Sequence, residues 1–85
     1  MLKGITKLGF RYEISDNRLN NFELLEMANE VDENPALMGK LLNLLLGERQ
    51  AKNLKNYLRD DEGFVPADKI TETVFEIFAN KKVKN

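Results

Sequence analysis

The chain has 85 residues, a length typical of one domain, and its 13 Lys and Arg residues against 14 Asp and Glu give a formal net charge of -1. It contains neither Cys nor His, which excludes disulfides, the usual zinc and copper ligands and the imidazole-activated nucleophiles of Ser and Cys hydrolases. The balanced charge disfavours a dedicated nucleic-acid binder, because phosphate contacts need a basic surplus.

The pattern along the chain predicts a single domain over residues 1–85, ordered over about residues 4–80 and followed by a frayed, Lys-rich tail at residues 81–85. The first residues lack the apolar run of a signal peptide, and no segment is long and apolar enough to span a membrane. We therefore expect a soluble, cytoplasmic protein.

Residues 5–14 have the pattern of a short β-hairpin. Their second part alternates apolar and charged residues, as a half-buried strand does: Phe10-Arg11-Tyr12-Glu13-Ile14. The segment Lys7–Gly9 predicts a tight turn in which Gly9 takes a positive φ. Because a two-stranded hairpin is unstable alone, we expect it to pack against helices.

The next segment predicts a polar loop at Ser15–Asn20 and then an amphipathic helix that ends before Pro35. Asn20 or Asn21 supplies the N-cap, because a side-chain oxygen there accepts a hydrogen bond from a free backbone N–H. The predicted apolar face of this helix consists of Phe22, Leu24, Leu25, Met27, Ala28 and Val31.

The block Ala36–Leu46 predicts a helix with a wide apolar face. At about 100° per residue its Leu and Met side chains cover roughly 200° of the helix, whereas a surface helix needs about 100° or a little more. Gly47 is the expected C-cap. Burial of each leucine contributes about 1.5–3 kcal/mol, so we expect the arc from Leu37 to Leu45 in the core. The margins of the arc are candidates for an interface: Met38, Leu42 and Leu46.

Two further helices complete the predicted fold. The first spans Glu48–Arg59, and its inward residues are Ala51, Leu54 and Leu58, with Tyr57 beside them. An acidic turn at Asp60–Gly63 precedes the last helix, which opens at Val65-Pro66 because the missing N–H of proline costs nothing in a first turn. Its apolar face consists of Ile70, Val74, Ile77 and Phe78, joined by Ala67 and Phe75. The predicted fold class is mainly α, with a short N-terminal β-hairpin and about four helices in one compact domain.

Charge is segregated along the chain. Five acids and no base lie between Leu19 and Gly39, whereas four bases and no acid lie between Arg49 and Arg59. On a helix these four bases fall within about 120° and form what we call the basic stripe: Arg49, Lys52, Lys55 and Arg59. The stripe is interpreted as a solvated face, a face paired with the chain's own acidic helix, a patch for an acidic protein, or a phosphate-contacting helix.

The predicted partner-binding residues combine the margins of the apolar arc with the basic stripe: Met38, Leu42, Leu46, Arg49, Lys52, Lys55 and Arg59. Opposite charges on different faces also suit head-to-tail contact between copies of the chain, which closes into rings or continues as a spiral.

The sequence contains no motif for catalysis, a cofactor or a metal. A calcium loop aligned on Gly63 would place Leu58 and Lys69 at its first and twelfth positions, where acidic ligands belong. The glutamates of the acidic helix share one solvated face and have no cleft of the kind that acid–base catalysis needs. Gly47-Glu48-Arg49 lacks the Lys-Ser/Thr of a phosphate-binding loop. We expect a protein that is not an enzyme and needs no cofactor.

A series of motifs resembles one known family. In chain order they are GFRYEIS (residues 9–15), FELLE (22–26), DENP (32–35), LLGERQ (45–50), LK (54–55), LRD (58–60), GFVP (63–66) and FEIF (75–78). Over residues 5–80 this order is similar to that of the small tail assembly chaperones of long-tailed, siphovirus-type phages and prophages, especially those of Gram-positive bacteria.

The resemblance implies a mainly helical, non-catalytic protein that binds the tape measure protein and tail tube components while the tail assembles. It also implies self-association into spirals or rings, action in the host cytoplasm and absence from the mature virion. Many such chaperones have a longer form made by ribosomal frameshifting. The resemblance assigns no catalytic or binding residue to this chain.

Two other classes of function stay open from the sequence. One is a small nucleic-acid-binding regulator that uses the basic helix at residues 48–59, and it requires binding that weakens steeply with salt. The other is a structural tail or head–tail component that remains in the virion.

Overall fold

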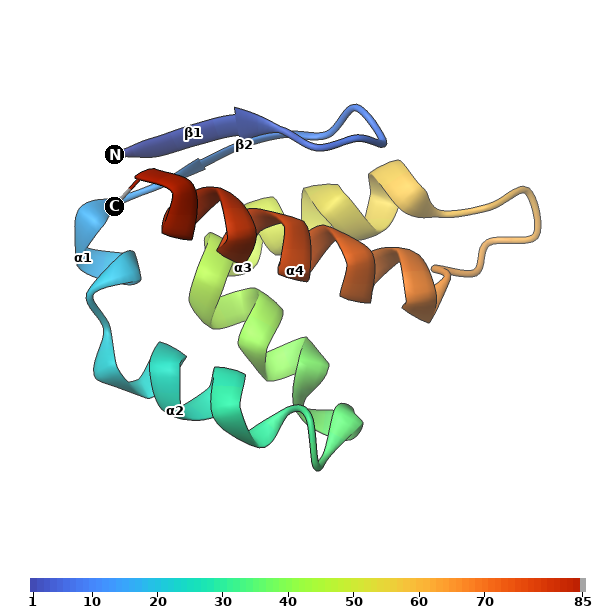
Figure 1. The fold of residues 1–85 in the computed structure, drawn as a ribbon. Coiled ribbons are helices and arrows are strands. Elements are labelled where there is room, and N and C mark those ends of the chain that lie inside the picture. Colours follow the sequence, from blue (N-terminus) through green and yellow to red (C-terminus); the bar gives the residue numbers. More distant parts are fainter. Residues whose placement is uncertain (85) are drawn as a thin grey trace.

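The computed structural model describes the backbone of residues 1–84 and the side chains of residues 1–80. In chain order its elements are β1 (Leu2–Ile5), β2 (Arg11–Ile14), α1 (Asp16–Leu19), α2 (Phe22–Glu30), the short 3-10 helix η1 (Pro35–Leu37), α3 (Met38–Leu58) and α4 (Ala67–Lys84). The hairpin lies across α4 and the C-terminal part of α3, and α2 packs on the other end of α3 (Figure 1). The predicted class, mainly α with an N-terminal hairpin, is confirmed.

The predicted hairpin turn at Lys7–Gly9 is confirmed. The backbone N–H of Thr6 donates to the carbonyl of Phe10 at 2.9 Å, and the N–H of Gly9 donates to the carbonyl of Thr6 at 2.8 Å. Gly9 has a φ of 95°, as a three-residue hairpin loop requires at its last position. The local chemistry of the turn therefore decides where the chain reverses.

The first strand begins at Leu2, three residues before the predicted start of the hairpin. Its first residues have no β-branched or aromatic pattern, and pairing with β2 makes them a strand. The antiparallel register sets Gly4 opposite Tyr12, whose ring covers the glycine so closely that a Cβ there would lie 2.6 Å from Cζ. The hydroxyl of Tyr12 accepts a hydrogen bond from Nδ2 of Asn80 at 2.7 Å, which ties the hairpin to α4.

A single helical turn, α1, replaces the polar loop predicted at Ser15–Asn20. Ser15 is its N-cap, and the Ser15 Oγ accepts a hydrogen bond from the N–H of Arg18 at 3.2 Å. None of the four residues of α1 is buried. A helix of four residues is too short to show a periodic signal in the sequence, which is why the prediction was wrong here.

Helix α2 begins as predicted, with Oδ1 of Asn21 accepting a hydrogen bond from the N–H of Glu23 at 3.1 Å. Only part of its predicted apolar face is covered: Phe22 is 70% exposed and Leu25 is also exposed. At about 100° per residue, Phe22 and Leu25 point well away from the direction of Leu24. The predicted residues of α2 and its C-cap that do pack in or against the core are Leu24, Met27, Ala28 and Val31.

Helix α3 is broken at Gly47, as the sequence predicts. Gly47 has a φ of 82° and a ψ of 157°, a conformation that is essentially restricted to glycine. The chain resumes as a helix at once, so the two predicted helices form one kinked element. We call residues 38–46 the first half of α3 and residues 48–58 the second half.

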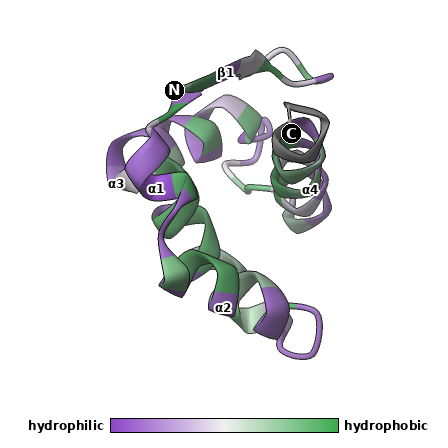
Figure 2. Ribbon diagram, turned by 60° about the vertical axis from the view of Figure 1, so that its left-hand side comes forward, coloured by the Kyte–Doolittle hydropathy of each residue, from purple (hydrophilic) through white to green (hydrophobic). Residues whose placement is uncertain are grey.

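The leucines of the first half form the centre of the core. Figure 2 shows mostly hydrophobic residues along this half and along α2 beside it. Contrary to the expectation that they lie at the margin of the buried arc, Leu42 is 1% exposed and Leu46 is 3% exposed. Both residues belong to the buried core cluster, so the wide apolar arc serves the fold. The exposed residues of this half are Gly39, Lys40 and Asn43.

Helix α4 presents Ile70, Val74 and Ile77 to the core, as predicted. The polar residue Thr73 is 1% exposed, and its hydroxyl donates to the carbonyl of Lys69 at 2.8 Å. Bonding to its own helix satisfies the hydroxyl, which allows a threonine at a buried position. Phe75, expected on the apolar face, is exposed.

The backbone of α4 is helical to Lys84. The tail predicted at residues 81–85 concerns side chains and a last residue that lie outside the described part of the chain, so its fraying stays a prediction. Among residues 1–84, no helix combines the length and the hydropathy that a bilayer crossing requires.

Candidate protein-binding surface

The seven predicted partner-binding residues are divided between two hollows and the open surface. A groove between α3 and α4 is lined by Met38, Leu42 and Lys55. A hollow at the kink of α3 is lined by Leu46 and Arg49. The exposed face of the second half and its C-cap carry Lys52 and Arg59.

The groove between α3 and α4 is mostly apolar and has a volume of about 350 Å³. Buried Leu42 and half-buried Met38 form one side, and Val65 and Ile70 form the other. Of the described residues that line it, only Lys55 is charged. An apolar groove with one cation at its edge suits an apolar side chain that has an acidic neighbour.

The basic stripe has no acidic partner in the described part of the chain. Within residues 1–80 the ion pairs join Met1 with Asp16, Lys3 with Glu13, and Lys69 with Glu72. Pairing of the stripe with the acids of α2, one of the alternatives from the sequence, is therefore not formed among these side chains. Arg59 uses its guanidinium locally, because Nη1 donates to the carbonyl of Gly63 at 2.7 Å.

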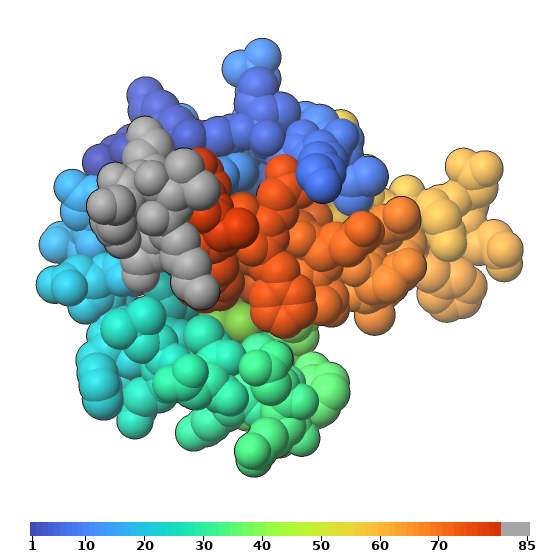
Figure 3. Space-filling model, viewed as in Figure 1, coloured from blue at the N-terminus to red at the C-terminus, as the bar shows by residue number. Residues whose placement is uncertain are grey.

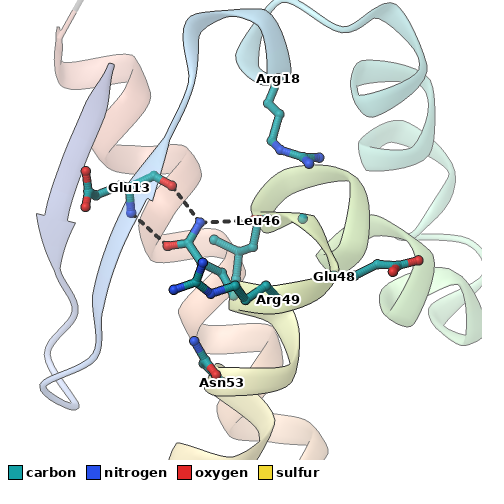
Figure 4. A pocket seen from close by; sticks show the side chains of 8 residues that line it. Glu13, Arg18, Leu46, Glu48, Arg49 and Asn53 are labelled. Carbon is teal, nitrogen blue, oxygen red and sulfur yellow. Dashed lines mark hydrogen bonds between the residues drawn. The ribbon is translucent and has the colours of Figure 1, made fainter.

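Arg18 and Gly47 both line the hollow at the kink of α3, which Figure 4 shows from close by. Nη1 of Arg18 donates to the carbonyl of Leu44 at 3.2 Å, so a cation caps the C-terminal end of the first half of α3. A Cβ on Gly47 would lie 2.8 Å from Nη2 of the same arginine. The positive φ favours glycine here, whereas the guanidinium of Arg18, as the end of a flexible side chain, could shift to admit a Cβ.

The side-chain amide of Gln50 joins β2 to the kink through both of its ends, by the hydrogen bonds to Glu13 and Leu46 that Figure 4 draws as dashed lines. Its Oε1 accepts from the N–H of Glu13 at 2.9 Å, and its Nε2 donates to the carbonyls of Glu13 at 2.6 Å and Leu46 at 2.9 Å. Sequence reasoning missed both Gln50 and Arg18. Neither role leaves a signal in the sequence, because each depends on a partner that only the folded chain brings close.

Large apolar side chains on the surface are a further feature that the sequence did not reveal. Within residues 1–80 the exposed ones are Met1, Ile5, Leu8, Phe22, Leu25, Tyr57, Phe64 and Phe75. Tyr57 has a structural role, because its hydroxyl donates to the carbonyl of Leu8 at 2.8 Å and its ring packs against Phe10 with 5.7 Å between centroids. Phe22 at 70% and Phe64 at 67% are the most exposed aromatic rings among these residues. Single exposed apolar residues are common, so each needs a second observation before it indicates a binding site.

The acidic segment Asp60–Gly63 is a turn, as predicted. Oδ1 of Asp60 accepts from the N–H groups of Glu62 and Phe64, each at 2.9 Å, so this carboxylate stabilises the turn. Within the residues that the structure describes, no group of three acidic side chains is arranged to hold a metal ion.

No protein-family model matches this chain, and no curated protein or solved structure shows significant similarity to it.

Proposed function

We propose that this chain is a non-catalytic assembly chaperone of a long-tailed phage or prophage. It binds the tape measure protein and tail tube components in the host cytoplasm and is left out of the finished virion. The observation that carries the proposal is the apolar groove between α3 and α4, which has Lys55 at its edge. The order of motifs shared with tail assembly chaperones supports the same function.

The groove has the chemistry needed to hold an amphipathic helix. Leu42 gives it an apolar floor, and the flexible thioether of Met38 adapts to side chains of different shape. Lys55 and the neighbouring bases of the stripe favour a helix with acidic residues beside its apolar face. A long helical protein presents many such segments before it is packed into a tail tube.

The direct test is co-expression of the chain with the tape measure protein of the same phage or prophage genome, followed by affinity capture. We expect the wild-type chain to retain the tape measure protein. Met38→Glu should reduce the retained amount by about tenfold or more, because a carboxylate would enter an apolar site.

Ile5→Glu is the matched control, because Ile5 is an exposed apolar residue on β1, which does not line the groove. It should retain the tape measure protein as the wild type does. Failure of the wild-type chain to retain this protein, or equal losses in the two variants, contradicts the proposal.

A nucleic-acid-binding regulator is the second candidate, and the observation that favours it is the basic stripe without an acidic partner within residues 1–80. Fluorescence anisotropy with labelled duplex DNA, single-stranded DNA and RNA separates the two functions. A chaperone is expected to show no specific binding to DNA or RNA that weakens steeply with salt. Such binding, lost in a variant with Arg49→Gln and Lys52→Gln, would replace our proposal by the regulator.

A structural tail component is distinguished by the composition of purified virions. The chaperone is expected to be absent from them by mass spectrometry, and its presence in a fixed ratio to tail proteins would establish the structural role.

A further inference from the structure

The solvent-exposed side of α2 is amphipathic in its own right. Leu24, Met27 and Ala28 turn toward the core, whereas the exposed residues of α2 are Phe22, Glu23, Leu25, Glu26, Asn29 and Glu30. At about 100° per residue these exposed residues cover roughly 160° of the helix, with Phe22 and Leu25 toward one flank and the three glutamates on the other. We call this surface the outer face of α2. Figure 3 shows α2 along the lower edge of the molecule in this view.

The outer face of α2 has the character of one side of an interface. Phe22 is 70% exposed, and Leu25, one turn later on the same side of the helix, is 43% exposed. Two large apolar side chains on one surface are the second observation that a single exposed ring lacks. The three glutamates beside them form no ion pair within residues 1–80. The complementary site is therefore an apolar hollow with basic residues at its edge.

The groove between α3 and α4 is such a site. Leu42 and Ile70 supply apolar walls, and Lys55 is the one charged residue among the described residues that line it. Lys52 is exposed one turn before Lys55 on the same helix and extends the positive charge. Neither lysine forms an ion pair within residues 1–80. No residue of α2 lines the groove, so the outer face of α2 does not fill the groove of its own chain.

Two complementary surfaces that share no residue give a head-to-tail contact between copies. Figure 1 shows α2 and α4 on different sides of the first half of α3. A copy that places its α2 in the groove of a neighbour keeps its own groove open to the α2 of another copy. Such a contact continues as a spiral or closes into a ring. The segregation of charge along the sequence suggested head-to-tail contact, and the folded chain contains two surfaces that suit it.

We propose that the outer face of α2 occupies the groove of a second copy, with Phe22 against its apolar walls and the glutamates of α2 facing Lys52 and Lys55. The inference rests on the proposed function only in that both use the same groove. Because α2 carries the apolar and acidic side chains that the groove selects in a tape measure helix, self-assembly and capture exclude each other at each groove. The neighbouring α2 keeps the groove covered until a tape measure helix displaces it.

Sedimentation velocity of the purified full chain, from micromolar to millimolar concentration, tests the contact. We expect the mass to rise with concentration and to pass beyond the dimer. Phe22→Glu on the outer face and Met38→Glu in the groove should each raise the dissociation constant by about tenfold or more, because a carboxylate would enter an apolar contact. Phe64→Glu is the matched control and should leave the constant unchanged, because Phe64 is 67% exposed and lies on neither surface. Circular dichroism establishes that the variants keep the fold.

A mixture of the Phe22→Glu and Met38→Glu chains separates a head-to-tail contact from damage to the fold. The first variant keeps an intact groove and the second keeps an intact α2, so one unaltered contact can form between them. We expect the mixture to form a complex of one copy of each variant and to stop there. Each variant alone should stay monomeric at the same concentration.

The same variant tests whether the two partners share the groove. Phe22→Glu should retain more tape measure protein than the wild type at a concentration at which the wild type assembles, because its groove is not covered by a neighbouring α2. An equal or smaller amount, in a chain that otherwise assembles as expected, contradicts the exclusion of one partner by the other.

The contact itself is overturned by a monomer at every concentration, a mass that stops at the dimer, equal effects of Phe22→Glu and Phe64→Glu, or no complex in the mixture. These outcomes stay distinct from those for the proposed function, because sedimentation uses no tape measure protein. A chain that assembles and fails to capture that protein contradicts the chaperone only, and capture by a strict monomer contradicts the contact only.

Discussion

Two regions of the molecule pack on α3 through different kinds of contact. At the hairpin end, side chains join segments that are distant in sequence: Gln50 bonds to Glu13, Asn80 to Tyr12, and Tyr57 to Leu8. The backbone N–H of Lys7 also donates to Oε2 of Glu76 at 2.9 Å. At the α2 end, apolar packing of Leu24 and Val31 against the leucines of α3 holds the helix. Among residues 1–80, no side-chain hydrogen bond or ion pair links α2 to another element.

Directional hydrogen bonds therefore position the hairpin end, whereas buried apolar area holds the α2 end. Hydrogen bonds require particular atoms at particular distances, so the hairpin end has one register. Apolar packing is proportional to buried area and tolerates small displacements. We therefore expect the α2 end to open at a lower free energy than the hairpin end.

The largest expected effects come from shortening one buried leucine side chain at the α2 end and one at the hairpin end. Leu24→Ala and Leu54→Ala both remove a fully buried leucine and should each cost about 2–5 kcal/mol in urea unfolding. In native-state hydrogen exchange, Leu24→Ala should speed exchange in α2 while α4 and the hairpin stay protected. Leu54→Ala should speed exchange throughout. Equal patterns in the two variants would show that the chain opens as one unit.

The next largest effect on stability is expected at Gly47, where the kink of α3 lies between the two regions. Gly47→Ala places a Cβ on a residue with a positive φ and should destabilise the fold by about 1–3 kcal/mol in thermal or urea unfolding. Gly39→Ala is the control, because a Cβ there meets nothing within 4 Å and the residue lies in the first turn of α3. It should stabilise by about 0.5–1 kcal/mol. A neutral Gly47→Ala would mean that the kink is not required for the fold.

The smallest effect on stability is expected when the hydrogen bonds of Gln50 at the hairpin end are removed. Gln50→Ala removes the bonds to Glu13 and Leu46 and should cost about 1–2 kcal/mol, with faster exchange of the β2 amides. Asn53→Ala, which changes a residue of the same hollow, should alter the stability by less than about 0.5 kcal/mol. If the two variants behave alike, the amide of Gln50 does not fix the hairpin.

Much of the fold could be predicted where the signal is local. The turn at Lys7–Gly9 and the break at Gly47 follow from glycine chemistry, and the buried face of α4 follows from the spacing of Ile70, Val74 and Ile77. The exposure of Phe22 could not be read in this way, because an apolar residue on a helix indicates burial only when another element covers its direction.

The candidate site was predictable by residue type and not by arrangement. The sequence predicted Met38, Leu42 and Lys55 as partner-binding residues. It placed Leu42 at the margin of the apolar arc, whereas in the structure Leu42 is buried and lines the bottom of a groove. Val65 and Ile70 complete that groove from a segment more than twenty residues away from Leu42. Nothing in the sequence indicated that the ring of Phe64 is exposed, whereas the structure shows the ring 67% exposed and the backbone N–H of Phe64 bonded to Asp60.

Composition and periodicity alone established a small, mainly helical domain with a hairpin, a dominant leucine helix and a basic stripe, because those properties depend on neighbours along the chain. The meeting of α3 with α4, the cover over Leu46 and the position of Arg18 at Gly47 emerged from the packing of elements, because they depend on neighbours in space. Binding surfaces belong to the second class, since a groove exists only between elements that the chain has already brought together.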